Sequence, residues 1–254
     1  MAEITVAEID NGAYWRVTFS NGKGNILDHE TMSKLTDVFR RAETSAPLKA
    51  ICLEGAGKHF SFGASVQEHM PGQVEHMFAT FRDLAFAMLE ADVVVIAAVR
   101  GQCLGGGLEV ATLCHRVIAS VDAMFGQPEI VLGVFAPIGS IALVDRVGRV
   151  NAEELCLTGR TIDAGVAHGM GLVNTVHEHP ADAAIAWAQE SFADRSASSL
   201  RHAVRAIRTD FVTKLRAELP VLEAQYLNQL MHTADAVEGL TAFVEKRTPA
   251  WRHE

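Results

Sequence analysis

The sequence has no apolar run long enough to cross a membrane. Its longest unbroken run extends from Val93 to Val99, far short of the roughly 20 residues that span a bilayer. The N-terminal residues Met-Ala-Glu-Ile-Thr also lack the basic and apolar regions of a secretion signal. We therefore expect a cytoplasmic protein that does not enter a membrane.

Basic residues are also scarce. The 254 residues include 22 Lys and Arg against 31 Asp and Glu, which gives a formal net charge of −9. Nucleic acids and anionic lipids are bound mainly through basic patches, so this balance argues against both as partners. An anionic ligand would have to be held by local Lys and Arg side chains.

Neither the cysteines nor the histidines show the spacing of a metal site. The four cysteines are Cys52, Cys103, Cys114 and Cys156. Each lies among apolar neighbours and none is part of a C-x-x-C pattern, so we interpret them as structural thiols. The histidines form no H-E-x-x-H pattern, and His177-Glu-His179 precedes Pro180 in an expected loop. We therefore predict no bound metal.

The composition is that of a folded globular protein. Hydrophobic residues make up 49% and charged residues 21% of the chain, whose length suits one large core with or without a helical appendage. Strand-like segments alternate with glycine-rich turns and helical segments as far as residue 148, and beyond about residue 151 the pattern is mainly helical. We predict an α/β core over residues 1–195 and a helical region over residues 196–254.

The expected strands are residues 4–10, 14–20, 48–53, 93–99, 117–119 and 124–125. The expected helices are residues 28–42, 65–90, 108–115, 151–157, 163–168, 181–192, 198–231 and 235–246. Asn11-Gly12 marks the first two strands as a hairpin. Ser65 and Glu68 fit a capping box at the start of a helix, and Pro220 should break or kink the longest helix.

Three consecutive glycines, Gly105 to Gly107, lie where a buried strand leads into a helix. Glycine lets the backbone approach a ligand closely, and the first N–H groups of a helix have no partner within it. The junction therefore predicts an anion or oxyanion site, with tight packing of the helix on the strand as the alternative. A nucleotide-binding glycine loop is disfavoured, because neither this segment nor Gly55-Ala-Gly-Lys58 has the required spacing.

Two glutamates stand alone in apolar surroundings. Glu109 falls in the first turn of the helix after the glycines, and Glu129 follows Pro128 in the next structural unit. An acid near a helix N-terminus is favoured electrostatically, but a buried carboxylate is costly unless it has a purpose. If both side chains reach one cleft, they can serve as a general acid and a general base.

Four segments, in this order, resemble the enoyl-CoA hydratase (crotonase) family. They are His59-Phe-Ser-Phe-Gly-Ala-Ser-Val66, Ala97-Ala-Val-Arg-Gly-Gln-Cys-Leu-Gly-Gly-Gly-Leu-Glu109, Phe125-Gly-Gln-Pro-Glu129 with Leu132-Gly133, and Ala242-Phe-Val-Glu-Lys-Arg247. The likeness extends from Ile4 to the end of the chain. Ser65 departs from the pattern, since family members usually carry Asp there.

The resemblance implies a spiral of β-β-α turns followed by helices that mediate assembly of a homotrimer or a dimer of trimers. Such proteins bind acyl-CoA thioesters, and two backbone N–H groups donate to the thioester carbonyl oxygen. At the matching positions these are Ala64 and Gly106, with Gly105 beside them at the substrate. Lys246 matches a lysine that contacts the CoA phosphate of a neighbouring subunit, although a cation at a helix end is the simpler alternative.

In hydratases of this family, glutamates at the positions of Glu109 and Glu129 hold the water that adds to a carbon–carbon double bond. Both glutamates are present here, so the resemblance implies reversible hydration of a conjugated acyl-CoA. Coenzyme A is part of the substrate, and no further cofactor is expected, because the reaction needs only polarisation and proton transfer.

The segment Gly133-Val-Phe-Ala-Pro-Ile-Gly-Ser140 is bulkier than the glycine-rich loop usual at this point of the family. With residues 60–71 and 196–205, it is similar to the branch of cyclohexa-1,5-diene-1-carbonyl-CoA hydratases of anaerobic aromatic-acid breakdown. Those enzymes form 6-hydroxycyclohex-1-ene-1-carbonyl-CoA. Phe62 and Phe135 are candidate walls for a flat ring, with ordinary core packing as the alternative.

Three other functions remain open from the sequence. A general 2-enoyl-CoA hydratase would use the same glutamates on a straight acyl chain. A ring-opening hydrolase would act on an alicyclic 2-oxoacyl-CoA. An RNA-binding protein of the same fold is the alternative outside enzymes, and the net charge of −9 argues against it.

Overall fold

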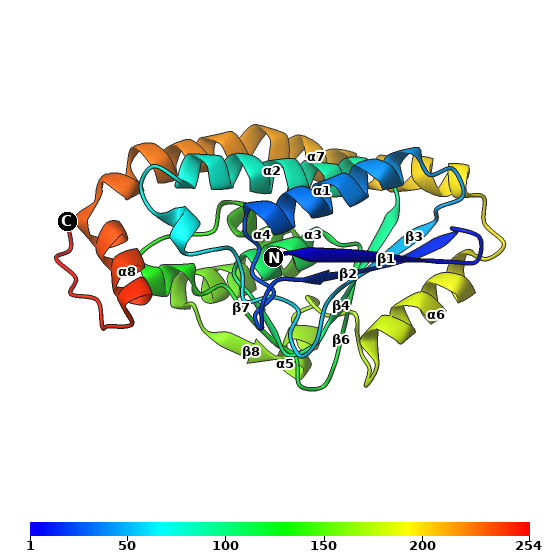
Figure 1. Ribbon diagram of the computed structural model, residues 1–254, viewed down its shortest axis with the longest axis horizontal. Coiled ribbons are helices and arrows are strands. Elements are labelled where there is room, and N and C mark those ends of the chain that lie inside the picture. The colour runs from blue at the N-terminus through cyan, green and yellow to red at the C-terminus, as the bar shows by residue number, and fades with distance from the viewer.

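The computed structural model describes residues 1–254 and contains two β-sheets with helices around them (Figure 1). The strands are β1 (Glu3–Ile9), β2 (Tyr14–Ser20), β3 (Ala50–Gly55), β4 (Val94–Val99), β5 (Gln102–Leu104), β6 (Arg116–Ala119), β7 (Met124–Gly126), β8 (Thr161–Asp163) and β9 (Thr175–Val176). The α-helices are α1 (His29–Thr44), α2 (Val74–Glu90), α3 (Gly106–Leu113), α4 (Pro137–Thr158), α5 (Ala164–Gly169), α6 (Pro180–Phe192), α7 (Ala197–Asn228) and α8 (Ala234–Glu245). The short 3-10 helices are η1 (Gln67–His69), η2 (Pro128–Leu132) and η3 (Leu230–His232).

The larger sheet has the strand order β1-β2-β3-β4-β6-β9, and the smaller one has the order β5-β7-β8. The predicted hairpin of β1 and β2 is confirmed, and the remaining pairs of the larger sheet are parallel. Parallel neighbours need a crossover between them, and the chain supplies it as turns, short strands and helices that wind around the sheets. The predicted α/β class and its spiral of strands and helices are confirmed.

Alternate residues of the central strands point to opposite faces of the larger sheet. In β3, Ile51 and Leu53 point into the main hydrophobic core, while Ala50 and Cys52 pack toward the small side chains of α6. Every residue of β3 and β4 is buried. A strand covered on both faces is mostly apolar rather than alternating, which is why residues 50–53 and 94–99 read as short apolar runs in the sequence.

Helices α1, α2 and α7 lie together on one side of the sheet, and α6 covers the opposite side (Figure 1). Leu215, Leu219 and Tyr226 of α7 are buried in the same core as the strands. The helix continues through Pro220, so the expected break is absent. Buried side chains on both sides of the proline hold this segment against α2 and α4, and this packing outweighs the missing backbone hydrogen bond.

The capping box predicted at Ser65 and Glu68 is wrong. Residues 67–69 form only η1, and α2 begins at Val74, after Gly72 adopts a left-handed φ of 85°. The Glu68 carboxylate instead accepts a hydrogen bond from the His29 N–H, with both carboxylate oxygens at 3.1 Å from the nitrogen. Glu68 therefore satisfies a free donor in the first turn of α1, a helix distant in the sequence.

Parts of the fold carried no clear sequence signal. The three-residue strands β5 and β8 were not expected, and neither was the first half of α4 from Pro137 to Val147. Gly148 interrupts α4 with a φ of 76° and a ψ of 161°, so the helix predicted over residues 151–157 is its second half.

None of the helices combines the length and the apolar character that crossing a membrane requires.

Helix α8 packs directly on the backbone of η2, the segment that carries Glu129. A Cβ atom at Gly239 would lie 2.2 Å from the Leu132 carbonyl oxygen and 2.8 Å from the Trp251 ring. We predict that Gly239→Ala lowers the free energy of unfolding by about 1–3 kcal/mol, because this overlap outweighs the better helix propensity of alanine. Denaturant unfolding measures the change.

Gly169 provides the matched control, because it also lies in a helix and has open space around the position of a Cβ. Gly169→Ala should leave the stability unchanged or raise it slightly. Equal effects of the two substitutions would contradict the close packing of α8 on η2.

Candidate active site

Gly105 joins β5 to α3, and Gly106 and Gly107 are the first two residues of α3. Each of the three glycines is approached closely by a different neighbour. Gly105 has a φ of 51° and a ψ of −126°, a conformation that a side chain strains. Added Cβ atoms would lie 2.6 Å from Glu129 Oε1 at Gly105, 3.0 Å from the Ala64 nitrogen at Gly106, and 2.7 Å from Ser61 Cβ at Gly107. The three positions therefore lack side chains because Glu129, Ala64 and Ser61 lie too close to admit one.

Two backbone N–H groups lie side by side at this turn without an acceptor in the protein. The Ala64 nitrogen is adjacent to Gly106, and a Cβ on Gly63 would lie 3.3 Å from the Gly106 nitrogen. Neither N–H donates a hydrogen bond to any protein group. The Ser61 hydroxyl fixes the turn before Ala64, since it accepts from the Gly63 N–H at 3.0 Å and donates to the Asn25 carbonyl at 2.8 Å.

Glu109 lies in the first turn of α3 and is only 4% exposed. Its Oε1 accepts a hydrogen bond of 2.6 Å from the Gly139 N–H in the first turn of α4. Burial raises the pKa of Glu109, and the nearby charge of Glu129 raises it further, while the Gly139 N–H acts in the opposite direction. The N-terminus of α4, which the sequence patterns did not predict, thus holds this carboxyl group.

Glu129 extends from η2 toward the same space. Its Oε1 accepts a hydrogen bond of 3.0 Å from the Gln127 side chain, and its Oε2 is buried with no partner. Burial raises the pKa of Glu129, and the Gln127 hydrogen bond opposes this shift. Because two buried carboxylates repel each other, the pair favours a state that holds at least one proton.

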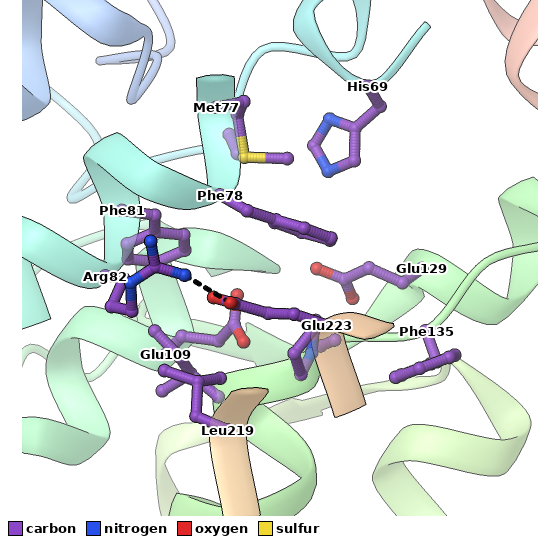
Figure 2. Close-up of a pocket in the computed structure, with 14 residues that line it drawn as sticks. His69, Met77, Phe78, Phe81, Arg82, Glu109, Glu129, Phe135, Leu219 and Glu223 are labelled. Atoms are coloured by element: carbon purple, nitrogen blue, oxygen red, sulfur yellow. Dashed lines mark hydrogen bonds and ion pairs between the residues drawn. The ribbon is translucent and has the colours of Figure 1, made fainter. Parts of the chain in front are cut away.

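Both glutamates line one small cavity of about 20 Å³, which is room for a single water molecule. Figure 2 shows aromatic side chains around it, with Glu109 and Glu129 entering from different elements. Its lining residues are Ala64, His69, Met77, Phe78, Phe81, Arg82, Glu109, Glu129, Phe135, Ala136, Pro137, Ile138, Leu219 and Glu223. We call this the inner cavity. The predicted convergence of two carboxylates and a backbone donor is therefore present in the structure.

An outer cavity of about 360 Å³ adjoins the inner one and shares Ala64, His69 and Glu129 with it. Its walls are mostly apolar and include Phe62, Leu104 and Val131. The two cavities therefore meet at Ala64 and Glu129, while Gly106 lines neither of them.

The remaining residues singled out in the sequence are distributed between the two cavities. Phe135 lines the inner cavity, whereas Phe62 and Gly105 line the outer one, so the two phenylalanines do not face a common space. Lys246 lines neither; it is exposed at the end of α8 with a left-handed φ of 56°. Phe243, one turn earlier in α8, does line the outer cavity. A role for Lys246 in binding CoA stays a prediction.

Three polar residues of the inner cavity were not singled out in the sequence. His69 Nδ1 lies 2.8 Å from the Ser65 carbonyl oxygen, which can only accept, so Nδ1 carries the proton of the neutral ring. Burial lowers the pKa of His69. Arg82 of α2 and Glu223 of α7 form an ion pair at the cavity wall (Figure 2).

The sequence did contain a signal for Glu223. Leu215, Leu219, Glu223 and Tyr226 follow one another at helical spacing and are all buried on the same side of α7. A carboxylate within an apolar stripe of a helix departs from the amphipathic pattern. His69 and Arg82 had no comparable signal, because they lie in a short turn and on an ordinary helix.

Comparisons with known proteins show which proteins this chain is similar to. The sequence profile of the enoyl-CoA hydratase/isomerase family matches residues 10–254. The cyclohexa-1,5-dienecarbonyl-CoA hydratase of Thauera aromatica is 45% identical over 96% of this chain and 94% of its own. The 2,3-dehydroadipyl-CoA hydratase of Escherichia coli strain K12 is 32% identical over 90% of each chain. The crystal structure of an enoyl-CoA hydratase from Bacillus anthracis superposes with a TM-score of 0.76 at 31% identity, covering 99% of both chains.

The raised pKa of Glu109 makes a prediction about stability and pH. The Glu109 carboxyl group binds its proton more tightly in the folded than in the unfolded state. The free energy of unfolding therefore falls as the pH rises from the unfolded pKa to the folded pKa of this group. Glu109→Gln does not titrate, and its side-chain oxygen can still accept from Gly139. We predict that it is more stable than the native protein by about 1–3 kcal/mol at pH 9.

At pH 4 the two proteins should be nearly equally stable, because the carboxyl group is then protonated in the folded state and mostly protonated in the unfolded state. Denaturant titrations at both pH values measure this difference. Glu178→Gln, on the exposed surface, is the control and should behave as the native protein. A native protein that equals or exceeds Glu109→Gln in stability at pH 9 would contradict the burial of a repelling pair.

Proposed function

The chain belongs to the enoyl-CoA hydratase/isomerase family, and we propose that it is the acyl-CoA hydratase that converts cyclohexa-1,5-diene-1-carbonyl-CoA into 6-hydroxycyclohex-1-ene-1-carbonyl-CoA. The observation that carries this proposal is the meeting of Glu109, Glu129 and the unpaired Ala64 N–H in one cavity. The relative from Thauera aromatica is named for hydration of the same diene. Coenzyme A enters as part of the substrate, and the reaction needs no other cofactor.

The geometry suits activation of a thioester. With its carbonyl oxygen between the Ala64 and Gly106 N–H groups, the substrate would place negative charge on that oxygen next to two fixed donors. These donors are part of the backbone and need not reorganise during the reaction. Removing one such donor typically costs about 2.7–4 kcal/mol of transition-state stabilisation. The carbonyl polarisation makes the β-carbon of the acyl group electrophilic.

The two glutamates then supply the water. A water molecule between them can donate to the free Glu129 Oε2 and to the second oxygen of Glu109. One carboxylate accepts a proton as the water oxygen bonds to the β-carbon. The buried pair has two raised pKa values, so its members can exchange protons near neutral pH, where general acid–base catalysis is most effective.

The aromatic walls of the inner cavity suit a compact, flat acyl group, and they must move apart to admit it. Phe78, Phe81 and Phe135 line it together with the aliphatic Ile138 and Leu219. Phe78 and Phe135 each contact the buried Tyr226 ring, with ring centroids 4.7 Å and 5.3 Å apart. A rigid ring binds between such flat walls with little loss of conformational entropy.

We also propose that the chain assembles as a homotrimer or a dimer of trimers. The support is the apolar surface near the C-terminus, where Phe243 is 56% and Val244 42% exposed. Exposed apolar side chains that lie together mark interaction surfaces. Light scattering of the purified protein would test this assembly, and a monomer would overturn it.

The function is tested with the purified protein and two substrates, cyclohexa-1,5-diene-1-carbonyl-CoA and crotonyl-CoA. We expect the diene to gain one water molecule, with a kcat/KM at least about tenfold above that of crotonyl-CoA. Ultraviolet absorbance and product mass follow the reaction. Turnover of crotonyl-CoA alone would overturn the ring assignment. Formation of a diacid mono-thioester from a 2-oxocyclohexane carboxyl-CoA would point to a ring-opening hydrolase instead.

The two-carboxylate mechanism predicts the effect of removing each acid. Glu109→Gln and Glu129→Gln should each lower kcat for hydration by about 10²–10⁴-fold, the usual contribution of a positioned acid or base. Binding of a non-reactive acyl-CoA analogue, measured by calorimetry, should change little, because the N–H groups and the cavity walls are untouched. Native rates in either variant would contradict the mechanism.

A further inference from the structure

A third carboxyl group faces the inner cavity, in addition to the pair of glutamates described above. Glu223 of α7 is 7% exposed and lines the cavity beside Leu219. The Arg82 guanidinium donates to its Oε2, and no protein group donates to its Oε1. Figure 2 shows the Arg82–Glu223 contact on the side of the cavity away from Glu129, with the Phe78 ring extending over the gap between them.

The surroundings of Glu223 suit a group that gains and loses a proton. Burial raises the pKa of Glu223, and Arg82 opposes this shift. The charged form that remains after proton loss is stabilised by the Arg82 guanidinium, while the protonated form suits the apolar wall. The Arg82 side chain is 38% exposed, so this end of the cavity is in contact with solvent, from which a proton can be replaced.

The proposed reaction requires a proton at a position that ordinary enoyl-CoA hydration does not use. In the diene, C1 carries the thioester, and the double bonds are C1=C2 and C5=C6. The polarised carbonyl activates C2 for attack by the water oxygen, and the electron pair of C1=C2 moves into a dienolate that extends over C1, C6 and C5. The named product keeps a double bond conjugated to the thioester, so the new C–H bond must form at C5.

C2 and C5 are opposite corners of the six-membered ring. A carboxyl group placed to deliver water to C2 therefore lies across the ring from C5. As the C5–H bond forms, the C5=C6 electron pair takes up the proton, the negative charge on the thioester oxygen collapses, and C1=C6 becomes the remaining double bond. Water is consumed, and one proton passes from the donor while another passes to a carboxylate of the glutamate pair.

From this arrangement we propose that Glu223, held by Arg82, is the catalytic residue that delivers the proton to C5 of the ring and removes it in the reverse reaction. The inference rests on the proposed function, because only the ring substrate requires this second proton site. Glu109 and Glu129 act at C2, and Glu223 acts at the opposite corner. Arg82 is a positioning residue, since it fixes Oε2 of Glu223 and leaves Oε1 to the substrate.

Deuterium exchange in the hydroxylated product tests whether Glu223, rather than the pair of Glu109 and Glu129, transfers the proton at C5. In product numbering the former C5 is C3, and an enzyme base that removes its proton in D2O will replace it with deuterium. We expect the native protein to exchange one C3 hydrogen, as followed by NMR. Glu223→Gln should slow this exchange by at least about 100-fold, and Glu223→Asp should give an intermediate rate.

The complementary variant separates the two sites. Glu109→Gln should lose exchange of the product hydroxyl with oxygen-18 water while keeping deuterium entry at C3 within about tenfold of the native rate. Glu218→Gln is the matched control on α7, because Glu218 is exposed on the outer side of the helix. It should leave both exchanges unchanged. Product affinity, measured by calorimetry, shows whether a variant has merely lost its binding site.

A purely structural role for Glu223 would lower stability or affinity and would leave C3 exchange at saturating product unchanged; that result would overturn the inference. Loss of C3 exchange in Glu109→Gln to the same extent as in Glu223→Gln would also overturn it. If the native protein forms no hydroxylated ring from the diene, the proposed function itself fails. Native hydration with native C3 exchange in Glu223→Gln contradicts only the assignment of Glu223.

Discussion

The site depends on keeping two repelling carboxyl groups out of water and close to each other. Isolated, such groups would take up protons or move apart, since a buried charge costs several kcal/mol. Three separate elements resist this: the first turn of α3 carries Glu109, the first turn of α4 binds it through Gly139, and η2 carries Glu129 against Gln127. The bare backbone at Gly105 leaves room for the second carboxyl group. The repulsion between the two buried carboxyl groups therefore destabilises the fold at the candidate active site.

Much of this arrangement could be predicted from local patterns. The hairpin at Asn11-Gly12, the buried runs of β3 and β4 and the helix after the glycines each depend on a few neighbouring residues. The pairing of Glu109 with Glu129 was predicted from their isolation among apolar residues and from the family motifs, and the structure brings both into one cavity. Such features could be predicted because a few neighbouring residues, or a short motif, determine them.

What escaped prediction depends on contacts between distant segments. Ser65 and Glu68 have the spacing of a capping box, yet Glu68 binds the first turn of α1 instead. Pro220 would break an isolated helix, but the packing of α7 on its neighbours keeps it continuous. His69 and Arg82 have ordinary sequence surroundings, and only the folded chain places them at the cavity. Phe62 was paired with Phe135 in the prediction, although the two line different spaces.

One wall of the inner cavity comes from Leu219 and Glu223 of α7, close to the C-terminal end of the chain. All the other lining residues precede residue 139, so they are synthesised long before this wall exists. The segments that carry Glu109 and Glu129 are therefore made before the helix that closes the cavity beside them. A chain that ends before α7 therefore lacks both one wall of this cavity and the core residues Leu215, Leu219 and Tyr226.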